Sequence, residues 1–87
     1  MTYEEEGVFM IVFLKGTASA DTIMNEAEMS EEETMEGINS LAKKGLLVIK
    51  DDGIEYTAAA KKTAEYKLMV EVQAHFQKLL KTEGEQE

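Results

Sequence analysis

Residues 30–57 have the sequence SEEETMEGINSLAKKGLLVIKDDGIEYT, in which the pattern of a capped amphipathic helix passes directly into that of a tight hairpin. Ser30 and Glu33 have the S-x-x-E spacing of a capping box, in which each side chain accepts a hydrogen bond from a backbone amide of the first turn. Gly45 suits the left-handed conformation that commonly ends a helix, so we predict a helix over about residues 31–44. Its buried stripe is predicted to consist of Met35, Ile38, Leu41 and Ala42.

The hairpin is predicted from Asp52-Gly53, a two-residue turn in which both positions can take positive φ. This turn sets a register in which opposite charges meet on one face and apolar side chains meet on the other. The predicted cross-strand pairs are Asp51–Ile54, Lys50–Glu55 and Ile49–Tyr56. The side chains predicted to face inward are Leu47, Ile49, Ile54 and Tyr56.

Residues 3–15 are predicted to form the first helix. Three glutamates at positions 4–6 suit the positive end of a helix dipole, and an apolar run extends from Val8 to Leu14. A buried strand would also fit the apolar run, but the length of the segment favours a helix. This helix would be apolar nearly all round, so one neighbouring layer cannot cover it.

A short helix and a long helix complete the set of predicted elements. The short helix spans about residues 20–28, and Thr17 and Ser19 are its candidate N-caps. Thr57 is predicted to cap the long helix, which covers about residues 58–81 and begins with three alanines. A helix of this length extends roughly 36 Å, which is more than a small domain needs for its own core.

Charge divides the chain into three parts. Eighteen acids, nine lysines and no arginine give a net charge of −9. Residues 1–57 hold thirteen acids and four lysines, residues 58–81 are net +3, and residues 82–87 are net −3. We predict a single domain over residues 1–81, with the helix of residues 58–81 serving dimerisation, and a disordered acidic tail over residues 82–87.

The composition excludes several classes of function. The chain has no cysteine, which excludes a disulfide framework, a cysteine-ligated zinc and a cysteine nucleophile. His75 is the single histidine, and no pairing of a nucleophile with a base stands out. We therefore predict that the protein is not an enzyme and has no catalytic residue, metal ligand or cofactor. No apolar run reaches the roughly 18 residues of a membrane helix, and the first residues are acidic, so we expect a soluble, cytoplasmic protein with no membrane partner.

The order of these elements resembles a winged helix-turn-helix. Residues 30–47, SEEETMEGINSLAKKGLL, are similar to the pattern in MarR- and ArsR-type regulators, where a serine-capped recognition helix is followed by a Gly-Leu pair and the wing. Residues 57–62, TAAAKK, resemble the wing exit of such proteins. The resemblance covers about residues 5–66. It implies a mainly α fold with a small β-hairpin and a long C-terminal helix.

The resemblance also implies which residues would contact DNA. In DNA-binding members the outward face of the recognition helix enters the major groove. The implied nucleic-acid-binding residues are Asn39, Ser40, Lys43, Lys44, Lys50, Lys61 and Lys62. This chain departs from the usual basic pattern, because residues 17–45 hold seven acids and two lysines, and Asp51 and Asp52 lie at the wing tip.

Two hypotheses about function follow from this conflict between architecture and charge. The first is a winged-helix DNA-binding protein of transcription-regulator type that acts as a homodimer. The alternative is an acidic winged-helix module that binds a protein partner and does not bind DNA. Double-stranded DNA is a possible partner that the net charge disfavours.

Dimerisation is predicted from two apolar surfaces that one small domain cannot bury. One is the first helix, and the other is a stripe along the last helix. Packing both across a two-fold axis would bury them. The predicted interface consists of Val8, Phe9, Val12, Phe13, Leu68, Met69, Val72, Phe76, Leu79 and Leu80. In the alternative, the last helix folds back on its own domain.

Overall fold

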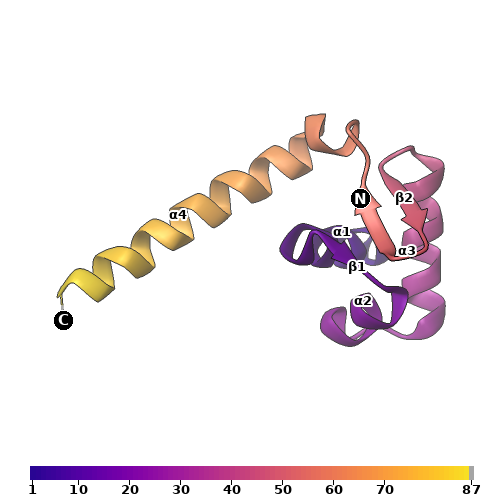
Figure 1. Cartoon of the computed structure of the whole chain (residues 1–87), viewed down its shortest axis with the longest axis horizontal. Coiled ribbons are helices and arrows are strands. Elements are labelled where there is room, and N and C mark those ends of the chain that lie inside the picture. The colour runs from indigo at the N-terminus through magenta and orange to yellow at the C-terminus, as the bar shows by residue number, and fades with distance from the viewer. Residues whose placement is uncertain (87) are drawn as a thin grey trace.

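Four α-helices, three short strands and one 3-10 turn make up residues 1–86. A computed structural model describes the backbone of residues 1–86 and the side chains of residues 1–80. The elements are α1 (Tyr3–Lys15), β1 (Thr17–Ala18), α2 (Ala20–Ala27), α3 (Glu31–Lys43), β2 (Leu47–Lys50), β3 (Gly53–Tyr56), the 3-10 turn η1 (Ala60–Lys62) and α4 (Ala64–Gln86). The fold is mainly helical with a small three-stranded antiparallel sheet, and a long helix ends it. In Figure 1, α4 projects away from the body formed by the other elements.

Helix α1 is the centre of the body and has the bounds that the sequence predicts. Thr2 and Glu5 form a capping box at its start, with the Glu5 amide donating to Thr2 Oγ1 at 3.2 Å. Helices α2 and α3 and strand β3 pack on α1, so Val8, Phe9, Ile11 and Val12 are buried by their own chain, whereas Met10 and Leu14 stay exposed. The buried core consists of Val8, Phe9, Ile11, Val12, Ala18, Ile23, Met29, Ile38, Leu41, Leu47, Ile54 and Ala60.

Helix α3 begins and ends as its sequence predicts. Ser30 and Glu33 form the capping box, with the Glu33 amide donating to Ser30 Oγ at 3.1 Å. At the other end, Gly45 has φ +77° and its amide donates to Ala42, while the Leu46 amide donates to the Leu41 carbonyl. These two bonds form the Schellman motif that glycine favours after a helix.

The buried face of α3 differs from the prediction at two positions. Met35 is 42% exposed and Ala42 is half-buried, whereas Thr34 and Gly37 are buried together with Ile38 and Leu41. Helices α1 and α3 approach each other closely at Gly37, where an added Cβ would lie 2.5 Å from the Glu4 carbonyl oxygen. Gly37 therefore belongs to the face of α3 that packs on α1, and Met35 lies on the exposed side.

The sheet contains a strand that the sequence analysis misses. Strand β1 lies beside β3, with Thr17 opposite Glu55 and Ala18 opposite Ile54, and the sheet order is β1-β3-β2. Thr17 is therefore a strand residue, and Ser19 alone caps α2 by accepting from the Thr22 amide at 3.1 Å. A strand of two residues is too short to show an alternating pattern.

The register of the hairpin corrects the prediction. Leu47 pairs with Tyr56 and Ile49 with Ile54, so the connecting residues are Asp51-Asp52 instead of Asp52-Gly53. Gly53 belongs to β3 with φ +144°, and a Cβ there would lie 2.6 Å from Thr17 Cγ2. The glycine is thus required by the neighbouring strand β1, which the sequence gives no sign of.

The shifted register preserves which side chains share a face but changes their burial. Leu47 and Ile54 are buried as predicted and Tyr56 is half-buried, whereas Ile49 is 58% exposed. Ile49 lies toward the tip of the hairpin, beyond the helices that cover the sheet. Lys50 and Glu55 are no longer directly opposite, yet their side chains still form an ion pair of 3.2 Å.

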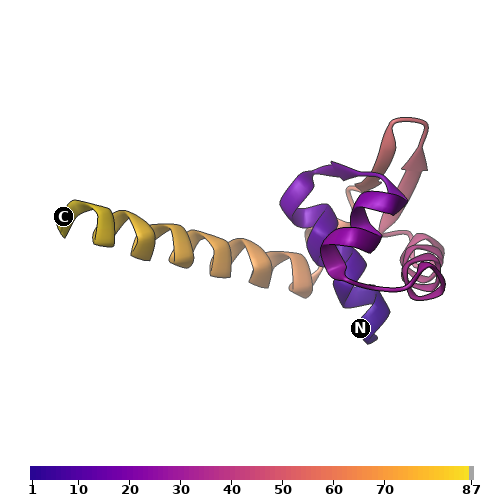
Figure 2. The same cartoon turned by 90° about the horizontal axis from the view of Figure 1, so that it is seen from below.

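Helix α4 starts later than predicted because two threonines divide the segment. Thr57 Oγ1 donates to the Gly45 carbonyl at 2.6 Å and accepts from the Ala60 amide at 3.3 Å, which starts η1. Thr63 then accepts from the Tyr66 amide at 3.2 Å and caps α4. The backbone stays helical through Gln86, beyond the predicted end at Lys81, and Glu87 lies outside the described residues. Figure 2 shows α4 leaving the body along a single direction.

Candidate functional site

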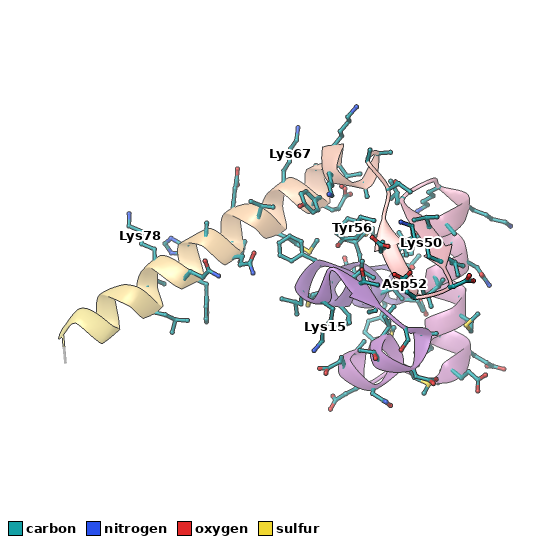
Figure 3. The ribbon with its side chains drawn as sticks, viewed as in Figure 1. Lys15, Lys50, Asp52, Tyr56, Lys67 and Lys78 are labelled. Atoms are coloured by element: carbon teal, nitrogen blue, oxygen red, sulfur yellow. The ribbon has the colours of Figure 1, made fainter. Side chains whose placement is uncertain are left out.

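The first candidate surface is the helix–hairpin face, which we define as the exposed side of α3 together with the tip of the β2–β3 hairpin. Acids outnumber lysines on it. Its exposed side chains are Glu31, Glu32, Met35, Glu36, Asn39, Lys43, Ile49, Lys50, Asp51 and Asp52. Figure 3 shows Lys50 and Asp52 at the hairpin, at the end of the molecule opposite the free end of α4.

The buried carboxylate of Glu5 contacts two of the residues that the resemblance predicts to bind DNA, Ser40 and Lys44. Glu5 is 1% exposed, and its Oε2 accepts a 2.9 Å hydrogen bond from Ser40 and lies 2.6 Å from Lys44 Nζ. Its Oε1 accepts from the Thr2 amide at 2.9 Å. The Lys44 ammonium, followed by the Thr2 amide, lowers the pKa of Glu5 from 4.5 to about 2, and burial opposes this shift only in part.

The sequence alone does not predict that Glu5 contacts Ser40 and Lys44 of the candidate surface. Thr2 and Glu5 have the same T-x-x-E spacing as a capping box, which would have placed this carboxylate at the start of α1. The additional contacts to α3 depend on how α1 and α3 cross, and no local pattern reveals them. Ser40 and Lys44 are therefore engaged with Glu5.

The other predicted DNA-contacting lysines divide into two groups. Lys50 is paired with Glu55 across the hairpin. Lys43, Lys61 and Lys62 are exposed, and within the side chains of residues 1–80 none of them forms an ion pair. The hydrogen bond from Thr57 to Gly45 holds the segment before η1 against the C-terminal end of α3. Three lysines per chain thus remain available near this end of the face.

An aromatic junction joins the hairpin, α1 and α4. The Tyr56 hydroxyl donates to the Phe9 carbonyl oxygen, and the Tyr56 and Phe9 rings lie 4.7 Å apart. Tyr66 of α4 contacts both Tyr56 and Phe13 edge-on, with centroids 5.5 Å apart in each pair. Burial raises the pKa of Tyr56, and the neighbouring Tyr66 raises it further. The junction fixes the first turns of α4 against the body.

The second candidate surface is the α1–α4 groove, an open apolar channel of about 540 Å³. It is lined by Met10, Phe13 and Leu14 from α1 and by Leu68, Met69, Val72, Gln73, Phe76, Gln77 and Leu80 from α4. Leu14, Leu68 and Phe76 are each 60–61% exposed. Met10 and Leu14 join this surface without having been predicted.

Three residues of the predicted dimer interface lie in the core of the chain. Val8, Phe9 and Val12 are at most 2% exposed, because they lie in the core of their own chain, and they are not part of any surface. The predicted α4 residues and Phe13 do lie on the surface, although Phe13 and Met69 are half-buried. Leu79 is 50% exposed beside the groove.

Neither a metal site nor a membrane-spanning helix is found beside these two surfaces in the described residues. Within it, no three His, Cys, Asp or Glu side chains come together in a way that could hold a metal ion. In the same residues, no helix combines the length and the apolar character needed to cross a membrane. Comparisons with protein-family models, curated proteins and solved structures find no match to the chain.

Proposed function

We propose that the chain is a winged helix-turn-helix module whose helix–hairpin face binds a basic protein partner and does not bind duplex DNA. The order of elements supports the architecture, since α2 and α3 form consecutive helices joined by a tight turn and β2–β3 takes the place of the wing. Glu28 in this turn has φ +55°, a left-handed conformation that reverses the chain between the two helices. Strand β1 ties the wing to the body.

Charge at the helix–hairpin face is the observation that carries the proposal. Duplex DNA presents about one negative charge per 1.7 Å, so a DNA-binding face needs unpaired cations. Here Lys44 and Lys50 are engaged with Glu5 and Glu55. The exposed stripe of α3 carries Glu32 and Glu36 instead. Such a face is complementary to lysine and arginine side chains of a protein partner.

DNA binding as a homodimer of transcription-regulator type is the second candidate. Lys43, Lys61 and Lys62 favour it, because they are exposed near the C-terminal end of α3. Asn39 on the outward side of α3 could read adenine, and glutamate can accept from cytosine. These base contacts add specificity only when phosphate contacts hold the protein in register.

Fluorescence anisotropy with a labelled mixed-sequence duplex tests the proposal. In about 50 mM salt, where electrostatic binding is strong, we expect no binding by the wild-type chain at tens of micromolar. The charge-reversal variant Glu32→Lys/Glu36→Lys/Asp52→Lys is expected to bind, with an affinity that falls steeply as salt rises. Salt-dependent binding of the duplex by the wild type would contradict the proposal and favour the second candidate.

A lysine- and arginine-rich peptide probes the protein-binding arm of the proposal. We expect the neutralised face variant Glu32→Gln/Glu36→Gln/Asp52→Asn to bind this peptide at least about tenfold more weakly than the wild type, a loss of about 1.4 kcal/mol. The matched control Glu26→Gln/Glu65→Gln/Glu71→Gln has the same net charge but leaves the face intact, so its affinity should stay closer to the wild type. Equal losses in both variants would show attraction to net charge alone and would count against a specific face.

A further inference from the structure

We infer that the α1–α4 groove is filled by the α4 helix of a second copy of this chain, with the two α4 helices antiparallel about a two-fold axis. This inference goes beyond the proposed function, because the groove is lined by α1 and α4, whereas the helix–hairpin face belongs to α3 and the hairpin. In Figure 1 the projecting part of α4 lies away from α3 and the hairpin.

The groove is an apolar surface that its own chain leaves open. Helix α1 covers only the beginning of α4, so Phe76, Leu79 and Leu80 are 50–61% exposed on the projecting part of the helix. Proteins that remain monomeric rarely expose continuous apolar patches of this kind. On the other side of the groove, Met10 and Leu14 of α1 are also more than half exposed. A rod-shaped apolar partner would cover both walls at once.

The spacing of the apolar residues in α4 identifies that partner. They lie symmetrically about the level of residue 74, with Leu68 as far before it as Leu80 is after it. The same relation joins Met69 to Leu79 and Val72 to Phe76. At 100° per residue all six side chains fall within one stripe of about 120°. A second α4 running the opposite way therefore packs Val72 against Phe76 and Met69 against Leu79 across the two-fold axis, while Leu68 and Leu80 lie at the same level on opposite edges of the stripe.

Charge and shape select the antiparallel orientation over the parallel one. The body of each chain, residues 1–57, has a net charge of −9. Parallel α4 helices would bring two such bodies side by side, whereas antiparallel helices place them at opposite ends of the pair. In the antiparallel pair the Phe76–Leu80 half of one α4 also lies beside Leu68 of the other, where it reaches Met10 and Leu14 of that chain's α1. Each chain thus completes the groove of its partner.

The polar residues that flank the stripe support the same arrangement. Figure 3 shows Lys67 and Lys78 on the side of α4 that faces away from α1 and α2. The groove itself carries Gln73 and Gln77 as its polar lining, so no charged side chain has to be buried when the second helix packs against it.

Sedimentation equilibrium tests whether the second copy binds. At about 10 μM, a concentration at which a dimer of nanomolar Kd is complete, we expect a mass of twice 9.7 kDa. Val72→Glu/Phe76→Glu is expected to give a monomer of unchanged helix content, because both residues are exposed in the single chain. The control Val70→Glu/Ala74→Glu has the same spacing and charge on the opposite side of α4 and should remain a dimer. A wild-type monomer, or a dimer that persists in the first variant, overturns the inference.

Disulfide cross-linking tests the orientation in the same full-length chain, which has no cysteine of its own. A mixture of Met69→Cys and Leu79→Cys chains should form cross-linked heterodimers on mild oxidation. Each variant alone should not, because in an antiparallel pair its two cysteines lie about 15 Å apart along the axis, far beyond disulfide reach. Self-cross-linking of Met69→Cys alone would show a parallel pair and overturn the inference. The mass and the cross-linking pattern do not depend on what the helix–hairpin face binds, so failure of the proposed function would leave both results unchanged.

Discussion

Replacing Gly37 by alanine is expected to lower the free energy of unfolding by about 3 kcal/mol, the upper end of the usual cost of overpacking a core. The added Cβ would lie 2.5 Å from the Glu4 carbonyl oxygen and 2.8 Å from Val8 Cγ2. A backbone oxygen cannot rotate away as the end of a side chain can, so α1 and α3 would have to separate. Urea denaturation followed by circular dichroism measures the change.

Gly7 provides the matched control, because it is also a helical glycine close to a neighbouring helix. Its added Cβ would meet the Met29 Sδ and Cε atoms at 3.0 and 3.1 Å, and these atoms are the flexible end of a side chain. Gly7→Ala should therefore leave the stability unchanged or raise it by up to about 1 kcal/mol through helix propensity. Equal destabilisation in both variants would show that the close crossing at Gly37 is not the cause.

Acid is expected to destabilise the protein through Glu5 by roughly 2–3 kcal/mol in total. In the unfolded chain this carboxyl takes up a proton near its ordinary pKa of 4.5, whereas in the folded chain the Lys44 ammonium and the Thr2 amide keep its pKa at about 2. Between these values the unfolded state binds more protons. The contribution of Glu5 is thus complete above about pH 4.5 and is lost as the pH falls toward 2. Lys44 is half-exposed, and solvent weakens the pair accordingly.

Glu5→Gln separates this carboxyl from the other acids of the chain. The variant keeps an oxygen that can accept from Ser40 or Thr2, but it loses the charge that Lys44 contacts. We expect it to be less stable than the wild type at pH 7 and nearly as stable at pH 2.5, so the difference between the two urea midpoints should shrink with acid. A difference that is the same at both pH values would rule out the ionised carboxylate as its source.

The sequence predicts the elements whose signals are local. The capping box at Ser30 and the glycine after α3 are enough to fix that helix to within a residue at each end. The length of the apolar run decides α1 in the same way. The register of the hairpin is predicted wrongly because Asp52-Gly53 is a good turn by itself, whereas Gly53 lies within β3, where its φ of +144° and the neighbouring strand β1 both favour glycine.

The sequence predicts fewer of the residues that form the two candidate surfaces, because burial and ion pairing depend on how distant segments of the chain meet. Apolar character alone cannot distinguish Val12, which lies in the core, from Leu14, which lines the groove. Ser40 and Lys44 have suitable residue types for phosphate contact, yet a carboxylate 35 or more positions earlier in the chain engages both. The acidic character of the helix–hairpin face, in contrast, follows from composition and is visible in the sequence.

The ring contacts among Phe9, Tyr56 and Tyr66 connect the first turns of α4 to the hairpin, so the position of the hairpin affects the direction of α4. Helix α4 has 23 residues and is therefore about 35 Å long. A tilt of α4 by only about 10° at these ring contacts moves the far end of the helix by roughly 6 Å. A ligand that displaces β3 would consequently change the direction in which α4 points, and small motions at one end of the molecule would be amplified at the other.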